Sequence, residues 1–197
     1  MKVVVTNHMT LDGVMQAPMA PEEDRRDGFE HGGWAAANAD DVMGKAMGER
    51  MAQGAAGGGA MLFGRRTYEH MAAFWPHQPA DNPYAKVLNE REKYVASRTL
   101  EAPLPWRNST LLDGDAADAV AALKERPGGN LSVLGSGELL QSLMRRDLVD
   151  QWVLLIHPLV LGTGRRLFPD GGAPARFRLT DTITTTTGVV IATYLPA

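Results

Sequence analysis

The feature that most constrains the fold is a segment type that occurs twice: an apolar run, a glycine turn and then a helical pattern. Residues 60–64 (AMLFG) lead into a helix predicted over 66–74. Residues 131–137 (LSVLGSG) lead into a helix predicted over 138–146. Short apolar runs that alternate with helices are typical of buried parallel strands joined by crossover helices. We therefore predict an α/β fold with a mostly parallel sheet flanked by helices.

Hydrophobic and β-branched patterns indicate strands and helices in the rest of the chain. Further strands are predicted at 2–7, 93–97, 109–113 and 150–162, and further helices at 34–53, 84–92 and 115–126. Residues 177–195 form two β-rich runs around Gly188, which predicts an antiparallel C-terminal hairpin. Residues 17–33 carry prolines, glycines and mixed charges and are predicted to form a long loop. Loops of this length in compact domains are usually functional or disordered.

Length and composition indicate an ordinary globular chain. It has 197 residues, of which 44% are hydrophobic and 22% are charged. These values are close to globular averages, and the length suits one substantial core better than two. No internal repeat or linker-like tract divides the sequence, so we predict a single domain over residues 1–197.

Charge and cysteine content exclude several classes of function. The net charge of −3 lacks the strongly basic footprint of a nucleic-acid-binding protein. The chain has no cysteine, which excludes disulfides, thiol nucleophiles and thiolate metal sites and fits a reducing cytoplasm. The N-terminal apolar run is too short for a signal peptide or a membrane span. We expect a cytoplasmic protein with a small-molecule substrate and neither a nucleic-acid nor a membrane partner.

The two glycine junctions are candidate anion sites. A helix that starts directly after a glycine turn exposes unpaired backbone N–H groups to a ligand. One such junction is weak evidence, because most of these turns simply connect a strand to a helix. Two junctions on neighbouring strands could hold an extended anion such as a dinucleotide pyrophosphate.

The common catalytic fingerprints do not match. Residues 135–140 (GSGELL) supply only the first two glycines of G-x-G-x-x-G, and no G-x-x-x-x-G-K-[ST] occurs. There is no H-E-x-x-H and no G-x-S-x-G, and the five histidines at 8, 31, 70, 77 and 157 lack ligand spacing. These absences argue against a standard Rossmann domain, a P-loop, serine hydrolysis and a metal site.

Five short motifs, taken in their order along the chain, resemble the dihydrofolate reductase superfamily. The motifs are MTLDGVM, LFGRRTYE, KYVASRTL, VLGSGELLQSL and LLIHPLVLGTGRRLF. Within the superfamily they are similar to the reductase domain of the bifunctional riboflavin-biosynthesis protein, the RibD C-terminal type. The resemblance implies a dihydrofolate-reductase-like sheet, bound NADPH and a homodimer. The zinc deaminase half of the bifunctional protein uses a cysteine-rich signature that this chain lacks.

The resemblance assigns the pyrophosphate of NADPH to the two glycine junctions. Arg65 would reach the adenosine 2′-phosphate, a role that suits its planar, bidentate guanidinium. Ser97 and Arg98 would lie on the adenosine side, and the segment that starts at Asp12 would lie beside the nicotinamide. The predicted cofactor-binding residues are Gly13, Val14, Gly64, Arg65, Arg66, Thr67, Ser97, Arg98, Gly135, Ser136, Gly137, Glu138 and Leu139. Without the other motifs, Asp12 and Gly13 would be interpreted as a plain turn, and the two arginines after Gly64 as a solvated helix face.

The substrate side of the site is less defined. Glu30, His31 and Asp12 are the candidate proton donors, with an ordered water as the alternative, and Trp34 offers a flat surface to a heterocycle. The competing interpretation makes Trp34 a core residue and the acidic groups solvated. The pair at 165–166 (RR) could supply charge for a ribose phosphate or could face water.

The predicted function is that of an NADPH-dependent oxidoreductase. It would reduce a small pterin- or pyrimidine-like heterocycle by hydride transfer from nicotinamide C4, and the hydride chemistry would belong to the cofactor. One alternative is 5-amino-6-(5-phosphoribosylamino)uracil reductase of riboflavin biosynthesis. An alternative of another class is a non-catalytic NADPH-binding protein.

Overall fold

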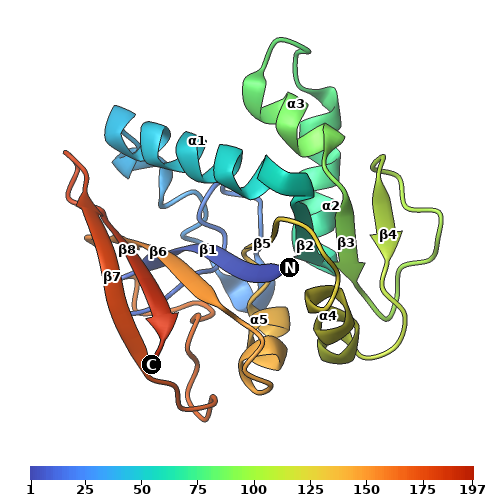
Figure 1. Ribbon diagram of the computed structural model, residues 1–197. Coiled ribbons are helices and arrows are strands. Elements are labelled where there is room, and N and C mark those ends of the chain that lie inside the picture. The colour runs from blue at the N-terminus through green and yellow to red at the C-terminus, as the bar shows by residue number, and fades with distance from the viewer. The chain divides into compact units, whose positions relative to one another are not determined.

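The computed structural model describes residues 1–197, which form eight β-strands and five α-helices (Figure 1). The chain divides into two compact units. Unit one consists of residues 1–5 and 48–150, and unit two consists of residues 6–47 and 151–197. Strand β1 (Lys2–Thr10) and helix α1 (Asp41–Ala55) each contribute residues to both units.

Unit one contains the parallel part of the sheet. Its strands are β2 (Ala60–Gly64), β3 (Lys93–Ala96), β4 (Ser109–Leu111) and β5 (Asn130–Leu134). Their order is β4-β3-β2-β5, followed by β1, and β2 pairs in parallel with both β3 and β5. The helices of this unit are α2 (Arg65–Phe74), α3 (Pro83–Glu90), α4 (Ala116–Lys124) and α5 (Gly137–Met144). Each strand–glycine–helix segment predicted from the sequence is present, as β2 with α2 and as β5 with α5.

An aromatic cluster forms the core between β2, β3 and the helices α2 and α3. Phe63, Tyr68 and Trp106 are almost completely buried, and the Phe63 and Trp106 rings stack with their centroids 6.0 Å apart. The backbone N–H of Trp106 donates to the Tyr68 hydroxyl at 3.0 Å. The first turn of α2 is therefore fixed against the end of β2, because Tyr68 belongs to α2 and Phe63 to β2.

Two buried cations hold the amino ends of the strands in unit one. The Arg91 guanidinium donates to the carbonyls of residues 54, 59 and 60 and to the Ser132 hydroxyl. The Lys93 ammonium donates to the carbonyls of residues 89, 91 and 107 and lies 4.5 Å from the centroid of the Trp106 ring. Burial lowers the pKa of Lys93 to about 8 and that of Arg91 to about 10. Neither cation has a carboxylate partner, so backbone carbonyls provide most of the compensation.

The stability of the chain should depend on the protonation of Lys93 in alkaline solution. The folded pKa of about 8 lies below the ordinary value of 10.5, so the unfolded chain holds more protons between these values and stability rises with pH across them. Relative to Lys93→Met, the wild type should gain up to about 3 kcal/mol over that range. Urea unfolding of both proteins near pH 7 and near pH 10 measures the difference. A difference that stays constant with pH would mean that the pKa of Lys93 is ordinary.

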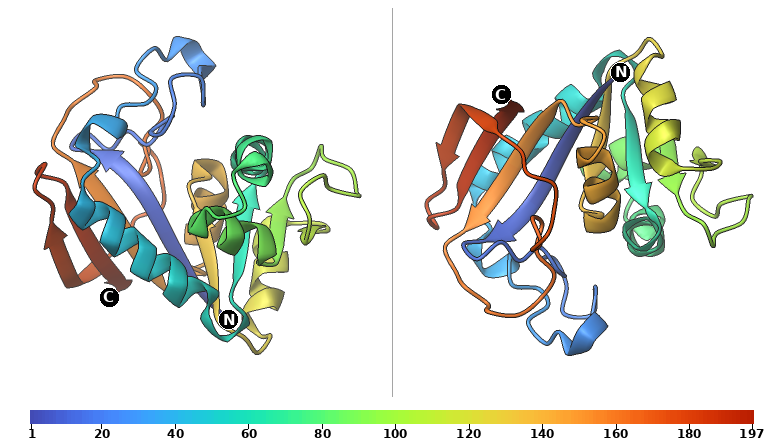
Figure 2. Two further views of the ribbon diagram at one scale, coloured as in Figure 1. Left: turned by 90° about the horizontal axis from the view of Figure 1, so that it is seen from above. Right: turned by 90° about the horizontal axis from the view of Figure 1, so that it is seen from below.

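Unit two contains the antiparallel part of the sheet. Its strands are β6 (Gln151–His157), β7 (Phe177–Thr184) and β8 (Val190–Pro196), in the order β1-β6-β8-β7. Strand β8 pairs antiparallel with both β6 and β7, and Figure 2 shows this hairpin from two further sides. The predicted α/β class, with a mostly parallel sheet, flanking helices and an antiparallel C-terminal hairpin, is confirmed.

No helix is long and apolar enough to cross a membrane.

Two element boundaries in unit two differ most from the sequence-based predictions. The helix predicted from residue 34 begins at Asp41, because Ala39 is extended and the Asp40 carboxylate caps the helix by accepting the N–H of Met43. The strand predicted to reach residue 162 ends at His157, because the next residue is Pro158, which has no N–H for a ladder.

Candidate functional site

The two glycine junctions of unit one are joined directly by one side chain. The Ser136 hydroxyl accepts the backbone N–H of Gly64 at 2.9 Å and donates to the Thr67 hydroxyl oxygen at 2.9 Å. Strands β2 and β5 are parallel neighbours, so both turns lie at the same carboxyl-terminal edge of the sheet. This edge is where open α/β sheets bind their ligands. The structure thus brings together the two turns that the sequence suggested as one anion site.

Close packing explains why these turns contain glycine. A Cβ atom at Gly64 would lie 3.2 Å from both Cβ and Oγ of Ser136. Gly135 has φ +61°, and a Cβ there would lie 3.6 Å from the Thr67 hydroxyl. Ser136 itself is left-handed, with φ 68°, a conformation that costs a non-glycine residue about 1 kcal/mol or more. The strained turn keeps its serine hydroxyl between the two junctions.

The helices that start at these junctions have amino ends without side-chain caps. Neither Gly64, which precedes α2, nor Ser136, which precedes α5, makes a side-chain capping bond to its helix. In contrast, Asn82 caps α3 and Asp115 caps α4, each by accepting two backbone N–H groups. The amino ends of α2 and α5 thus lack the capping residue that α3 and α4 have, and the positive dipole ends of the two helices favour an anion there.

Three arginines surround this edge, and they differ in how they are engaged. Arg65 forms an ion pair with Glu69 at 3.0 Å, and Arg66 lies 3.9 Å from Glu138. Arg98 follows the end of β3, is exposed, and has no hydrogen bond or ion pair in the structure. Arg98 can therefore bind a phosphate without first giving up a carboxylate partner.

Ser97 shapes the turn that carries Arg98. Its hydroxyl accepts the backbone N–H groups of Thr99 and Leu100 at 3.1 and 3.0 Å. Since β3 is the other parallel neighbour of β2, this turn lies at the same edge of unit one as the glycine junctions. All the predicted cofactor residues outside the N-terminal segment thus belong to one edge of one unit.

The N-terminal segment predicted for the nicotinamide side belongs to unit two. The Asp12 carboxylate accepts hydrogen bonds from the Thr10 hydroxyl at 2.5 Å and from the backbone N–H groups of Leu161 and Gly162 at 3.3 and 2.9 Å. The bond from Thr10 is the main cause that lowers the pKa of Asp12. The Asp12 carboxylate is therefore ionised near neutral pH, and its oxygens already accept hydrogen bonds. This disfavours Asp12 as a proton donor. Asp12 instead anchors the loop after β6.

The turn after Asp12 has the geometry that the sequence suggested. Gly13 has φ +83°, and its N–H closes the turn on the carbonyl of residue 10. Val14 is completely buried and forms an isolated β-bridge with Arg166. The Arg166 Nε donates to the Asp12 carbonyl at 2.8 Å, which lays the arginine stem against Gly13. An exposed guanidinium therefore stands beside the segment predicted for the nicotinamide.

The long loop over residues 17–33 packs against the loop that carries this arginine. Arg165 forms an ion pair with Asp27 at 2.9 Å, and its backbone N–H donates to the Gln16 side chain. Gly164 has φ +111°, and a Cβ there would come within 2.6 Å of the Phe29 ring. The two loops of unit two therefore fit together without space for a side chain at Gly164.

The other residues predicted for the substrate side, Glu30, His31 and Trp34, lie in different environments. Glu30 and His31 are exposed, and the His31 ring meets the Phe29 ring edge-on with centroids 5.6 Å apart. Trp34 is buried in the cluster with Val14 and Phe29, and its Nε1 donates to the Gln16 carbonyl at 2.7 Å. For Trp34, the burial favours the alternative interpretation as a core residue.

Unit two also holds a pair of histidines that no sequence pattern indicates. Nδ1 of His8 lies 2.9 Å from Nε2 of His157, and the two residues stand on β1 and β6. Burial lowers the pKa of each imidazole to about 4, so both are neutral at neutral pH. Their separation of 149 positions in the sequence hid the pair, and only the pairing of the two strands brings them together.

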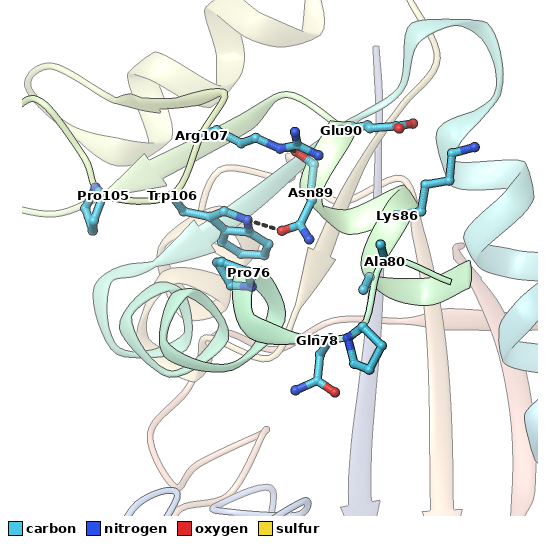
Figure 3. Close-up of a pocket in the computed structure, with 11 residues that line it drawn as sticks. Pro76, Gln78, Ala80, Lys86, Asn89, Glu90, Pro105, Trp106 and Arg107 are labelled. Atoms are coloured by element: carbon cyan, nitrogen blue, oxygen red, sulfur yellow. Dashed lines mark hydrogen bonds between the residues drawn. The ribbon is translucent and has the colours of Figure 1, made fainter. Parts of the chain in front are cut away.

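A hollow of about 610 Å³ in unit one lies away from all these residues (Figure 3). Two of its lining residues are joined by a hydrogen bond: Trp106 donates to the Asn89 side-chain oxygen at 2.6 Å, and the Asn89 amide donates to the Trp75 carbonyl. These bonds tie the segment before β4 to helix α3. No residue predicted for cofactor or substrate lines the hollow, so we attribute its polar groups to the packing of unit one.

Comparison with known proteins identifies the family. The model of the RibD C-terminal domain matches residues 1–191. The chain belongs to the RibD C-terminal domain family. Among relatives with curated sequences, YyaP of Bacillus subtilis (strain 168) is 28% identical over 137 residues, which cover 68% of this chain and 72% of YyaP.

Solved structures similar to this RibD C-terminal domain support the same fold. A candidate riboflavin biosynthesis protein from Shewanella sp. PV-4 has a TM-score of 0.69 at 22% identity, with 100% of this chain and 99% of that chain covered. Dihydrofolate reductase from Enterococcus faecalis, in a complex with NADP(H) and RAB-propyl, has a TM-score of 0.59 at 11% identity, with 99% and 96% covered. The predicted RibD C-terminal family is confirmed, and these structures confirm the predicted dihydrofolate-reductase-like fold.

Proposed function

We propose that this chain is an NADPH-dependent reductase of a small pterin- or pyrimidine-like heterocycle. The observation that carries the proposal is the pair of uncapped helix starts joined through Ser136. An extended dianion is the ligand that two adjacent helix amino ends suit best. Membership of a reductase family, and the NADP(H) held by a structurally similar dihydrofolate reductase, support NADPH as that ligand.

Each part of unit one would have a separate task in holding the cofactor. The turns at Gly64 and Gly135 would let the backbone approach the pyrophosphate, and Thr67 would offer its hydroxyl. Arg98, with Arg65 after it leaves Glu69, would pair with the adenosine 2′-phosphate. When bound, NADPH supplies the hydride from nicotinamide C4, and no residue of the chain needs to act as a covalent catalyst.

The chain would also have to supply a proton to the reduced substrate. Glu30 and His31 are exposed side chains, and they stay our candidates together with an ordered water. Asp12 is a weaker candidate, because its carboxylate already accepts three hydrogen bonds. We propose that Asp12 instead holds the backbone around Gly13 and Val14 in the shape that the nicotinamide side requires.

The test is consumption of deuterated NADPH against a panel of substrates. The wild-type chain would be mixed with NADPH labelled at C4 and with pterins, pyrimidine phosphates and quinoid compounds, and deuterium in the product would be measured. Transfer of the label to one class of heterocycle is expected. NADPH binding without transfer to any member of the panel would favour the non-catalytic NADPH-binding alternative.

A second candidate function is favoured by the position of Arg166. Its exposed guanidinium lies beside the segment assigned to the nicotinamide side and would suit the phosphate of a ribosylamino-pyrimidine. This supports 5-amino-6-(5-phosphoribosylamino)uracil reductase as the specific activity. Under that activity, Arg166→Met should raise KM for the phosphorylated substrate about tenfold or more and leave its dephosphorylated analogue unaffected.

Discrimination between NADPH and NADH should depend on the arginines of unit one. Arg65→Ala and Arg98→Ala should each weaken NADPH binding much more than NADH binding, because only NADPH carries the 2′-phosphate. We expect the larger loss, about tenfold, for Arg98→Ala, since Arg65 must break its pair with Glu69 first. Fluorescence titration with both dinucleotides measures the ratio. Equal weakening of the two dinucleotides by both variants would refute the assignment.

We also propose that the reductase is homodimeric, as its resemblance to the riboflavin-type reductases implies, and that it is cytoplasmic. The absence of cysteine fits a reducing compartment.

A further inference from the structure

The His8–His157 pair in unit two carries an unusual polar atom. His157 is completely buried, and its Nδ1 has no hydrogen-bond partner. Its Nε2 is 2.9 Å from Nδ1 of His8, and the Trp34 ring stands almost perpendicular to it, with centroids 5.1 Å apart. His8 is partly exposed. The pair therefore runs from the completely buried His157 to a residue that keeps some exposed surface.

The unpartnered nitrogen decides which way the hydrogen bond points. If His8 donated from Nδ1, His157 would carry its proton on Nδ1, as a buried N–H without an acceptor. Such orphaned donors are rarer in folded proteins than unsatisfied acceptors. The favoured arrangement leaves a lone pair on Nδ1 of His157 and makes its Nε2–H the donor to Nδ1 of His8. The proton of neutral His8 is then on Nε2.

The location of the pair is that of a ligand site in this class of sheet. The N–H of Leu11 donates to the carbonyl of Leu159, two residues beyond the end of β6, so the carboxyl ends of β1 and β6 lie together within unit two. Ligands of α/β sheets bind outside these ends. His8 also precedes by four positions the Asp12 turn assigned to the nicotinamide side.

We propose that His8 donates a hydrogen bond from Nε2 to the substrate heterocycle, and that His157 is the positioning residue that fixes this tautomer. The proposal rests on the proposed reductase function and deepens it by specifying the substrate. The heterocycle must present an acceptor, a carbonyl oxygen or an unprotonated ring nitrogen, to His8. Because both imidazoles are neutral, the hydrogen bond from His8 requires an acceptor atom on the substrate and does not require a negative charge there.

The tautomers of both histidines can be determined by NMR on the full chain without any ligand. A long-range proton–nitrogen-15 correlation spectrum at neutral pH distinguishes protonated from unprotonated ring nitrogens, and His8→Gln and His157→Gln assign the signals. We expect that both rings are protonated at Nε2 and unprotonated at Nδ1. In His157→Phe, His8 should show a mixture of both tautomers. A proton on Nδ1 of either ring in the wild type, for example pointing at the Trp34 face, would overturn the proposal.

The donor role can be tested with lumazine, a pteridine dione, titrated into the chain with NADP⁺ present. Replacing His8 by Met removes the donor and should weaken lumazine binding about tenfold, the typical worth of one hydrogen bond. His8→Gln keeps an N–H close to the same position and should lose only about twofold. The exposed His77 of unit one is the matched control, and His77→Gln should leave the affinity unchanged.

The outcomes separate this proposal from the proposed function. Equal losses in His8→Met and His8→Gln would overturn the donor role, and absence of lumazine binding to the wild type would overturn the assigned substrate class. Failure of the wild type to bind NADPH would instead defeat the proposed function, and would leave the ligand-free tautomer assignment standing.

Discussion

Gly64→Val should raise the Kd for NADPH about a hundredfold while the chain remains folded. The backbone at Gly64, with φ −78° and ψ 161°, suits any residue, so the substitution introduces no backbone strain. Its Cβ, however, would lie only 3.2 Å from Cβ and Oγ of Ser136, and the valine methyl groups would extend beyond it. The two glycine junctions would be pushed apart, and the helix starts could no longer meet one pyrophosphate.

The matched control is Gly44→Ala on helix α1. A Cβ at Gly44 would meet nothing within 4 Å, so NADPH affinity should be unchanged and stability should rise by about 0.5–1 kcal/mol. Calorimetric titration gives the affinities, and thermal unfolding verifies that both variants are folded. Normal NADPH affinity in a folded Gly64→Val would show that this junction does not hold the cofactor.

Arg91→Met should lower the free energy of unfolding by about 3 kcal/mol or more, the largest stability effect expected in this chain. The substitution keeps much of the side-chain volume but leaves four acceptors, three carbonyls and the Ser132 hydroxyl, without their charged donor. These acceptors lie at the start of β2, in the end of α1 and in β5, so the loss would loosen the strands that carry both glycine junctions. Urea unfolding monitored by circular dichroism measures the change.

Arg145→Met is the control for a simple loss of positive charge. Arg145 is exposed and its guanidinium donates only to the Ser142 hydroxyl, at 3.2 Å, so its replacement should change stability by no more than about 0.5 kcal/mol. If Arg91→Met were equally mild, the buried guanidinium would contribute little net free energy, and the amino ends of β2 and β5 would be held by strand pairing alone.

The local patterns in the sequence were sufficient to predict most of the fold. Apolar runs followed by glycine predicted β2 with α2 and β5 with α5, because strand burial and helix initiation are decided by near neighbours in the chain. The start of α1 was predicted seven residues too early, because the alanine-rich segment before it has helical composition. The capping carboxylate of Asp40 also bonds to Thr186, a contact that no local pattern reveals.

The candidate site was only partly predictable, because local patterns do not reveal contacts between residues that are distant in the sequence. The two glycine junctions could be predicted from local sequence. The hydrogen bond from Gly64 to the Ser136 hydroxyl could not, because it requires that β2 and β5 be neighbours in the sheet. The engagement of Arg65 by Glu69 follows helical spacing, whereas the freedom of Arg98 does not follow from any pattern. His8 and His157 had no sequence signal at all, since an isolated histidine on a strand is as often a core residue as a ligand contact.

We propose that the edge of unit one built from β2, β3 and β5 binds the phosphates of NADPH. Calorimetric titration of the wild-type chain with NADPH and NADH tests it most directly. We predict binding of one NADPH per chain with micromolar Kd, at least about tenfold tighter than NADH. Absence of NADPH binding, or equal affinity for the two dinucleotides, would contradict the account.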